Sequence, residues 1–92
     1  MQEKILRQIK IFDTTLRDGE QAPGASMKAE EKFHVAQILR KMKVDVIEAG
    51  FPAVSNDDFN AVKTIAENVK DIKVAALSRA KFSDIEKCSE AL

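Results

Sequence analysis

The pattern of hydrophobic and polar positions alternates between two periods along this chain. Short apolar runs at residues 9–13, 44–50 and 72–77 are rich in β-branched side chains, which is typical of strands. After each run, apolar residues recur every three or four positions, which predicts a helix with one buried face. We therefore predict three strand–helix units, the first helix covering residues 27–43.

Serine residues stand where the predicted helices should begin. Ser26 is suited to cap the first helix, and the pairs Ser55 with Asp58 and Ser83 with Glu86 have the spacing of a capping box. The predicted apolar stripes are Ala29, Phe33, Ala36, Leu39 and Met42 on the first helix, Phe59, Val62, Ile65, Ala66 and Val69 on the second, and Ile85, Cys88 and Leu92 on the third.

Alternation of strands and helices predicts an α/β fold with right-handed crossovers and a parallel sheet. Residues 1–92 contain no linker-like stretch, so we expect no internal domain boundary. Parallel sheets are covered on both faces. Three units would leave one face bare, so we expect either more sheet in a longer chain or pairing with another chain.

Composition removes several classes of protein. The net charge is zero, with 15 basic and 15 acidic residues, which argues against a nucleic-acid binder. A single cysteine cannot form an internal disulfide, and no apolar run approaches the ~20 residues that span a bilayer. The first eight residues lack the apolar stretch of a signal peptide. We expect a cytoplasmic protein that has no contact with membrane.

Charged side chains follow the first predicted strand, where functional groups of parallel α/β folds gather. Asp18 offers oxygen ligands suited to Mg²⁺ or Mn²⁺, with Zn²⁺ as an alternative. Arg17 could stabilise an oxyanion or bind a carboxylate. Composition alone favours a solvated loop in which neither residue has a role, because charged loops are common.

Glu48 interrupts the second apolar strand and shares a face with Val44 and Val46, opposite Ile47. Burying a lone carboxylate is costly, so we expect a partner, and Arg17 at the end of the neighbouring strand is the obvious one. The pair could support catalysis or could simply be a structural ion pair between two strands.

Three further residues carry weaker signals. Arg79 follows the third strand and could face the same end of the sheet, although arginine is common in loops. His34 has no second ligand at helical spacing, so we interpret it as a surface residue. Cys88 falls on an apolar stripe, which favours packing over nucleophilic chemistry. The glycines fit no nucleotide-binding fingerprint.

The run Phe12-Asp13-Thr14-Thr15-Leu16-Arg17-Asp18-Gly19-Glu20-Gln21 closely resembles the first-strand motif of the Claisen-condensing acyl-CoA enzymes. That family includes 2-isopropylmalate, citramalate and homocitrate synthases, with hydroxymethylglutaryl-CoA lyase as a distant relative. Residues 46–52 and 74–79 resemble its second and third strands. Residues 22–27 look most similar to the 2-isopropylmalate branch.

The resemblance implies the first three strand–helix units of a metal-dependent (β/α)8 TIM barrel. The family's metal-binding aspartate falls on Asp18, its catalytic arginine on Arg17 and its supporting glutamate on Glu48. Gln21 and Arg79 are weaker candidates for substrate contact. The family completes its metal site with two histidines from a later strand, and this chain has only His34.

The activity implied is condensation of acetyl-CoA with 2-oxoisovalerate to give 2-isopropylmalate and CoA, the first committed step of leucine biosynthesis. The implied partners are a divalent metal, the rest of the barrel and a second copy in a homodimer, so the isolated chain should be inactive. Alternatives are a citramalate or homocitrate synthase, or a non-catalytic partial-barrel interaction module. A free-standing small α/β binding domain would not explain the motif.

Overall fold

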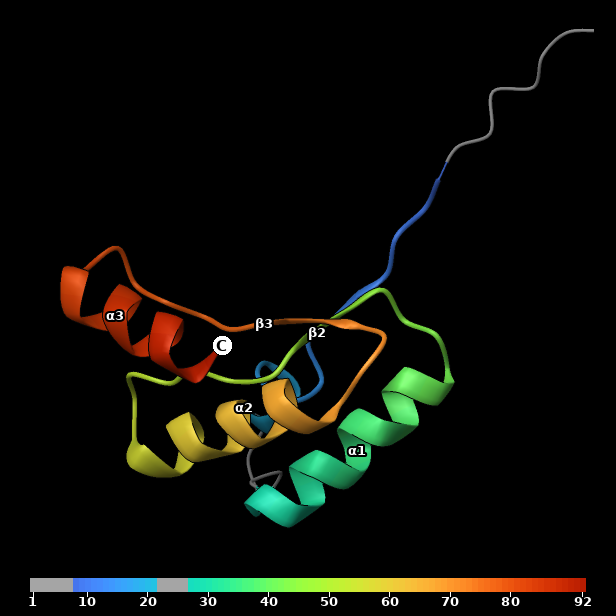
Figure 1. Ribbon diagram of the computed structural model, residues 1–92, viewed down its shortest axis with the longest axis horizontal. Helices are drawn as coiled ribbons and strands as arrows, with labels where there is room; N and C mark the ends of the chain where they lie inside the picture. Colours follow the sequence, from blue (N-terminus) through green and yellow to red (C-terminus); the bar gives the residue numbers. More distant parts are fainter. Residues whose placement is uncertain (1–7, 22–26) are drawn as a thin grey trace, which may run out of the picture.

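The computed structural model describes residues 8–21 and 27–92 and has an α/β architecture. Strands alternate with helices along the chain, apart from one short 3-10 helix after the first strand (Figure 1). The elements are β1 (Phe12–Asp13), η1 (Gly19–Gln21), α1 (Ala29–Lys41), β2 (Val46–Glu48), α2 (Asn56–Asn68), β3 (Lys73–Ala75) and α3 (Phe82–Ala91).

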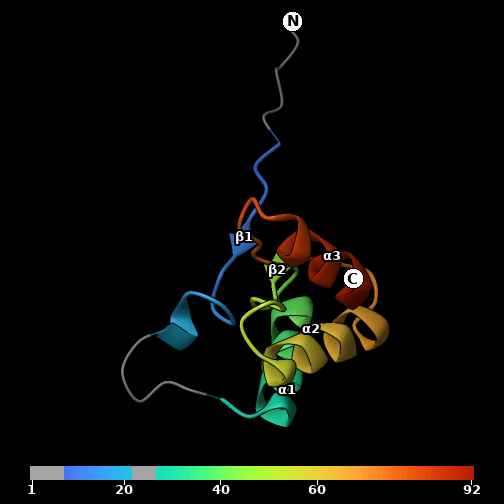
Figure 2. The same ribbon diagram turned by 90° about the vertical axis from the view of Figure 1, so that its left-hand side faces the viewer.

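The described strands form one parallel sheet in the order β1-β2-β3, as the sequence predicts. Phe12 pairs with Val46, and Val46 in turn with Lys73, so these three side chains share one face. Ile47 lies on the opposite face, which the helices cover. Figure 2 shows all three helices on the same side of the strands.

The strands are shorter than their apolar runs. Ile9 is 79% exposed and contributes to no ladder, and the backbone N–H of Ile11 donates to the Asp45 carboxylate at 2.6 Å. Beyond β2 and β3, Ala49 N–H donates to the Ala75 carbonyl and Leu77 N–H to the Gly50 carbonyl, both at 2.8 Å. The strands therefore remain paired up to the end where the predicted functional residues lie.

The core lies between the sheet and the helices. Its buried members come from β2 and its extension, from the loop after β1 and from the inner faces of the helices. They are Leu16, Ala36, Leu39, Ile47, Ala49, Val62, Ile65, Val69 and Ala91. The α2 stripe agrees with the sequence prediction, since its valines and isoleucine are buried and the other two members are partly buried.

The other two apolar stripes were partly wrong. On α1, Ala29 is exposed and Met42 is 67% exposed, because the buried face runs through Lys32 instead. On α3, Ile85 and Leu92 are 55% and 54% exposed, because the helix turns Asp84 and Ala91 inward.

Two of the three predicted serine caps were also wrong. Lys28 holds the N-cap position of α1, and its N–H donates to the Glu31 carboxylate at 2.8 Å; Ser26 lies outside the described residues. Lys81 precedes α3, with Ser83 already inside the first turn. Only Ser55 acts as predicted, since its hydroxyl accepts the Asp58 N–H at 3.0 Å. Even there the predicted capping box is incomplete, because the Asp58 carboxylate accepts the Phe51 N–H instead of returning to the backbone of Ser55.

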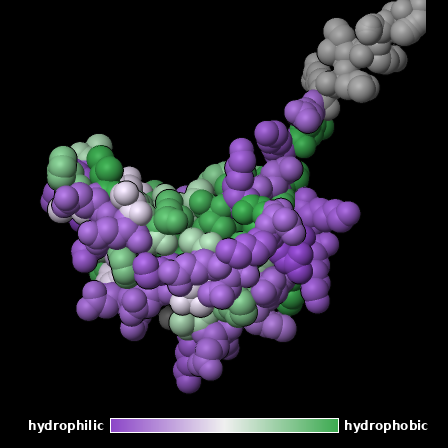
Figure 3. All heavy atoms as spheres, in the orientation of Figure 1, coloured by the Kyte–Doolittle hydropathy of each residue, from purple (hydrophilic) through white to green (hydrophobic). Residues whose placement is uncertain are grey.

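The second face of the sheet is open within the part of the chain that the structure describes. Phe12 is 52% exposed on it, and Ile11 next to it is 51% exposed. In Figure 3 apolar residues gather along the upper side of the molecule, where Figure 1 draws the strands. The bare face expected from the sequence is therefore present.

Candidate functional site at the strand ends

The turn after β1 presents Arg17 and Asp18 on a rigid backbone. Three successive N–H groups, of residues 17 to 19, donate to the Thr14 carbonyl at 2.7–3.1 Å. The Asp13 carboxylate accepts the Thr15 N–H at 2.9 Å and its hydroxyl at 3.1 Å. Leu16 is fully buried beneath the turn. This local bonding leaves the backbone little freedom to move the two charged side chains.

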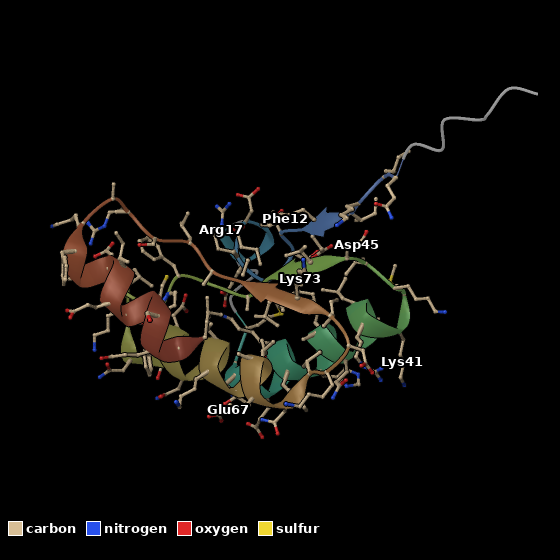
Figure 4. All side chains as sticks on the ribbon, turned by 45° about the horizontal axis from the view of Figure 1, so that its top comes forward. Phe12, Arg17, Lys41, Asp45, Glu67 and Lys73 are labelled. Atoms are coloured by element: carbon tan, nitrogen blue, oxygen red, sulfur yellow. The ribbon has the colours of Figure 1, made fainter. Side chains whose placement is uncertain are left out.

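Arg17 meets Glu48 at the end of the neighbouring strand, as their order in the sequence predicts. The guanidinium Nε donates to Glu48 Oε1 at 2.8 Å. The Glu48 side chain is 9% exposed, whereas Arg17 is 25% exposed. A charge-assisted hydrogen bond from Nε fixes the guanidinium plane, while Nη1 faces the Asp18 carboxylate and Nη2 can bind an anion. Figure 4 shows Arg17 beside the strands, away from the helix side that carries Lys41 and Glu67.

Asp18 is the open acidic group of this cluster. Its side chain is 66% exposed, and Oδ1 lies 3.5 Å from Arg17 Nη1. With Glu48 on the other side of the guanidinium, the three side chains carry one net negative charge. An exposed carboxylate in a negatively charged cluster fits one ligand position of a hard divalent cation.

The described residues do not complete a metal site by themselves. Among residues 8–21 and 27–92, no three histidine, cysteine, aspartate or glutamate side chains converge on one point. His34 is exposed on α1, so its interpretation as a surface residue is confirmed. The donor chemistry of Asp18 thus fits one ligand position of a metal, and any further ligands would have to come from outside this set or from water.

A buried lysine links the loops after β1 and β2. Lys32, only 3% exposed on α1, places its Nζ 2.6 Å from Glu20 Oε1 and 3.3 Å from Asp58 Oδ1. The second oxygen of Asp58 accepts the N–H of Phe51, which follows β2, at 3.0 Å. Lys32 therefore connects η1 to the start of α2, and Asp58 extends this connection to the loop after β2.

Gly50 allows α2 to approach the end of β2 this closely. A Cβ placed on Gly50 would lie 3.0 Å from a Val62 methyl and 3.3 Å from Asp58 Oδ2. Contacts this short would push the helix or the Asp58 carboxylate away. The glycine thus protects the bond between Asp58 and the Phe51 backbone.

Arg79, after β3, is held by a different acidic partner. Its Nε donates to Asp84 Oδ2 at 2.7 Å and its Nη2 to Oδ1 at 3.2 Å. The hydrogen bond from Arg79 lowers the pKa of Asp84 below its ordinary value, and the same bond raises the pKa of Arg79. The guanidinium also lies 5.8 Å from the Phe51 ring centroid. Arg79 thus packs against the β2 loop, and its hydrogen bonds and ion pair within the described part of the chain do not involve Arg17 or Glu48.

Cys88 packs beneath the end of β3, in line with its predicted packing role. It is partly buried, and its Sγ–H donates to the Leu77 carbonyl at 3.2 Å. Burial raises the pKa of the thiol. A thiol with a raised pKa is a poor nucleophile at neutral pH.

The groups that connect the loops were not predicted from the sequence. Lys32 stands four residues before the buried Ala36, so helical spacing could have placed it on the inner face. Hydrophobicity alone gave no reason to bury a lysine. Gln21 ends η1 in the structure, and its proposed substrate contact stays a prediction.

Comparison with known proteins identifies relatives for nearly the whole chain. The model of the "HMGL-like" family matches residues 8–92. The chain is 59% identical to a 2-isopropylmalate synthase of Halothermothrix orenii over 85 residues, which are 92% of this chain and 16% of the relative. It is 61% identical to the Variovorax paradoxus enzyme over 85 residues, again 92% of this chain and 17% of the relative.

The same degree of similarity recurs in a Burkholderia pseudomallei 2-isopropylmalate synthase, 61% identical over 89% of this chain and 16% of the relative. The chain therefore spans about a sixth of the length of these curated relatives. No helix among the described residues is both long enough and apolar enough to cross a membrane.

Proposed function

The chain belongs to the HMGL-like family, and on that premise we propose that it is part of an acyltransferase that joins acetyl-CoA to 2-oxoisovalerate. The acetyl methyl carbon would bond to the keto carbon, and water would then hydrolyse the thioester to release 2-isopropylmalate and CoA, so the protein would serve leucine biosynthesis in the cytoplasm. The observation that carries the proposal is the Arg17–Glu48 pair, which stands beside the exposed Asp18 in a chain about 60% identical to 2-isopropylmalate synthases.

We propose further that the three strand–helix units begin a (β/α)8 barrel. The sheet is parallel, the described helices cover only one face, and within residues 8–21 and 27–92 no further strand pairs with β1 or β3. In a TIM barrel the inner face of the sheet packs on itself, and eight units take about 250 residues. Further strands joining β1 and β3 would cover Phe12 and the neighbouring apolar side chains. A homodimer of the complete enzyme is part of the same proposal.

The proposed chemistry needs negative charge to be stabilised on oxygen. After deprotonation of the acetyl methyl group, the enolate of acetyl-CoA attacks the keto carbon, and the keto oxygen gains negative charge. The terminal nitrogens of Arg17 can donate to that oxygen while Nε stays bonded to Glu48. Because Glu48 is nearly buried, the guanidinium is oriented before substrate binds, which is the condition for strong electrostatic catalysis.

Asp18 would hold the divalent metal, Mg²⁺ or Mn²⁺, or Zn²⁺ as an alternative. A metal at this position would act as a Lewis acid toward the 2-oxo acid. Asp18 supplies one anionic ligand, and its exposure at the strand end leaves it accessible to both metal and substrate. Gln21 and Arg79 are the weaker candidates for substrate contact.

The test is a chimaeric synthase in which this chain replaces the segment it matches in the Halothermothrix orenii enzyme. We expect the chimaera to release CoA from acetyl-CoA only when 2-oxoisovalerate and Mg²⁺ or Mn²⁺ are present. Preference for a shorter or a dicarboxylic 2-oxo acid would instead favour a citramalate or homocitrate synthase. A folded chimaera with no metal-dependent CoA release would refute the proposal.

A further inference from the structure

The buried Lys32 has no part in the proposed chemistry, yet it lies at the centre of the contacts between two strand-end loops. Its side chain is 3% exposed, and it contacts carboxylates on both sides, Glu20 and Asp58. Replacing such a group by a well-packed apolar side chain is often neutral or stabilising, so a buried ion triad is weak evidence for a purely stabilising role. The arrangement requires another explanation.

Each of the two carboxylates also bonds to the backbone of a segment next to the site. Glu20 lies two residues after Asp18, and its other oxygen accepts the Met27 N–H at 3.0 Å. Glu20 is therefore bonded on one side to the approach to α1 and on the other to Lys32. The position of the Asp18 turn relative to α1 depends on these two contacts.

Asp58 connects Lys32 to the loop after β2. Its Oδ1 faces Lys32, and its Oδ2 accepts the Phe51 N–H, three residues after Glu48. Asp58 itself is fixed by the Ser55 hydroxyl, which accepts its backbone N–H. A shift of Lys32 would therefore be transmitted to the backbone that follows Glu48.

We infer that Lys32 is a positioning residue, which sets the separation between the Asp18 turn and the end of β2 through Glu20 and Asp58. The inference rests on the proposed function for its consequence at the metal. A cation shared by two loops holds both in one arrangement, so Asp18 stays in place for the metal while Arg17 stays in place for Glu48. An apolar side chain of equal length could fill the space but could not hold either carboxylate.

The experiment uses the chimaeric synthase with Lys32→Met, Lys32→Arg and Lys63→Met. Lys63 is a matched control, because it pairs with Glu67 at 3.6 Å on the exposed surface of α2. Two quantities are measured on metal-free protein: amide hydrogen exchange in peptides covering residues 14–21 and 50–54, and the dissociation constant of Mn²⁺ from titration.

We expect Lys32→Met to speed exchange in both peptides and to weaken Mn²⁺ binding about ten-fold or more, the usual scale for groups that orient metal ligands. Lys32→Arg should show smaller changes in both amide exchange and Mn²⁺ affinity, and Lys63→Met should change neither quantity. A folded Lys32→Met protein with Mn²⁺ affinity within about two-fold and unchanged exchange would overturn the inference.

A milder variant keeps the inference testable if Lys32→Met does not fold. Glu20→Gln retains the contact between Lys32 and Asp58, so faster exchange should be confined to residues 14–21, and unchanged exchange there would overturn the inference. Failure of the unsubstituted chimaera to bind Mn²⁺ would overturn the proposed function and the metal role of Lys32 together. Exchange is measured without metal or substrate, so the two failures are distinguishable.

Discussion

Arg17→Lys is the substitution that best separates geometry from charge at this site. The guanidinium donates to Glu48 Oε1 through Nε at 2.8 Å, and its Nη1 lies 3.5 Å from Asp18 Oδ1. A lysine keeps the positive charge but has only one nitrogen, which can bond Glu48 or a reacting oxygen, not both at once. The change therefore removes a donor and leaves the net charge of the cluster unaltered.

The expected loss follows from the exposure of the site. Removal of one preorganised oxyanion donor typically lowers kcat by about 10²–10³-fold. The Arg17 side chain is 25% exposed, so water can replace part of the lost hydrogen bonding. We therefore expect the lower end, a fall of about 100-fold in kcat, equivalent to roughly 2.7 kcal/mol of transition-state stabilisation. KM for the 2-oxo acid should change much less, because the bond is made in the transition state.

The assay follows CoA release by the chimaeric synthase with a thiol reagent, at saturating acetyl-CoA and metal. Arg40→Lys is the matched control, since among the described residues the Arg40 side chain donates to Gln37 alone, at 3.2 Å, near the end of α1. The control should keep full activity. If Arg17→Lys retained kcat within about three-fold of the unsubstituted chimaera, the role assigned to the guanidinium would be wrong.

Four further outcomes are expected in the same chimaera. Asp18→Ala should abolish metal-dependent turnover while His34→Ala leaves it nearly unchanged, and an active Asp18→Ala protein would refute the ligand assignment. Gly50→Ala should lower the free energy of unfolding by about 1–3 kcal/mol through overpacking and so lower the apparent Tm. An unchanged Tm would show that α2 can move aside. The pKa of Asp84 is lowered from 3.8, so its stabilising contribution is full above that value and disappears as the pH falls through the lowered pKa. Asp84→Asn should therefore lower Tm at pH 7, with a difference that narrows below pH 3.8 in a melting series; a constant difference would contradict this. Cys88 has a raised pKa, so iodoacetamide should modify it more slowly than a free cysteine at pH 8, as mass spectrometry can check, and an equal rate would contradict the burial argument.

The parallel sheet and the Arg17–Glu48 pair could be predicted because both follow from local rules. A strand period beside a helix period indicates a parallel α/β sheet, and strand alternation placed Glu48 on the face opposite the core. A carboxylate in an apolar strand then required a cation nearby, and the adjacent strand end supplied one. The burial and the 2.8 Å bond agree with that reasoning.

The errors concern contacts between distant segments. Helical periodicity placed Ala29 and Met42 on the inner face of α1, but Lys32 occupies that face because two carboxylates from other elements meet it there. On α3, Asp84 turns inward to bond Arg79, and this rotation exposes Ile85. Local pattern rules count only apolar residues and cannot anticipate a buried polar side chain whose partners lie many residues away.

Polar contacts between loops supplement the pairing of the strands. Arg17 and Asp18 follow β1 and Glu48 ends β2, and parallel pairing alone fixes only the backbone register of those ends. The loops that follow are joined by Lys32 and by the packing of Arg79 on Phe51. If these contacts were only structural, weakening them would lower stability and leave the metal affinity of the folded protein unchanged. If they position the loops, the affinity for Mn²⁺ should fall in step with the loosening of residues 14–21.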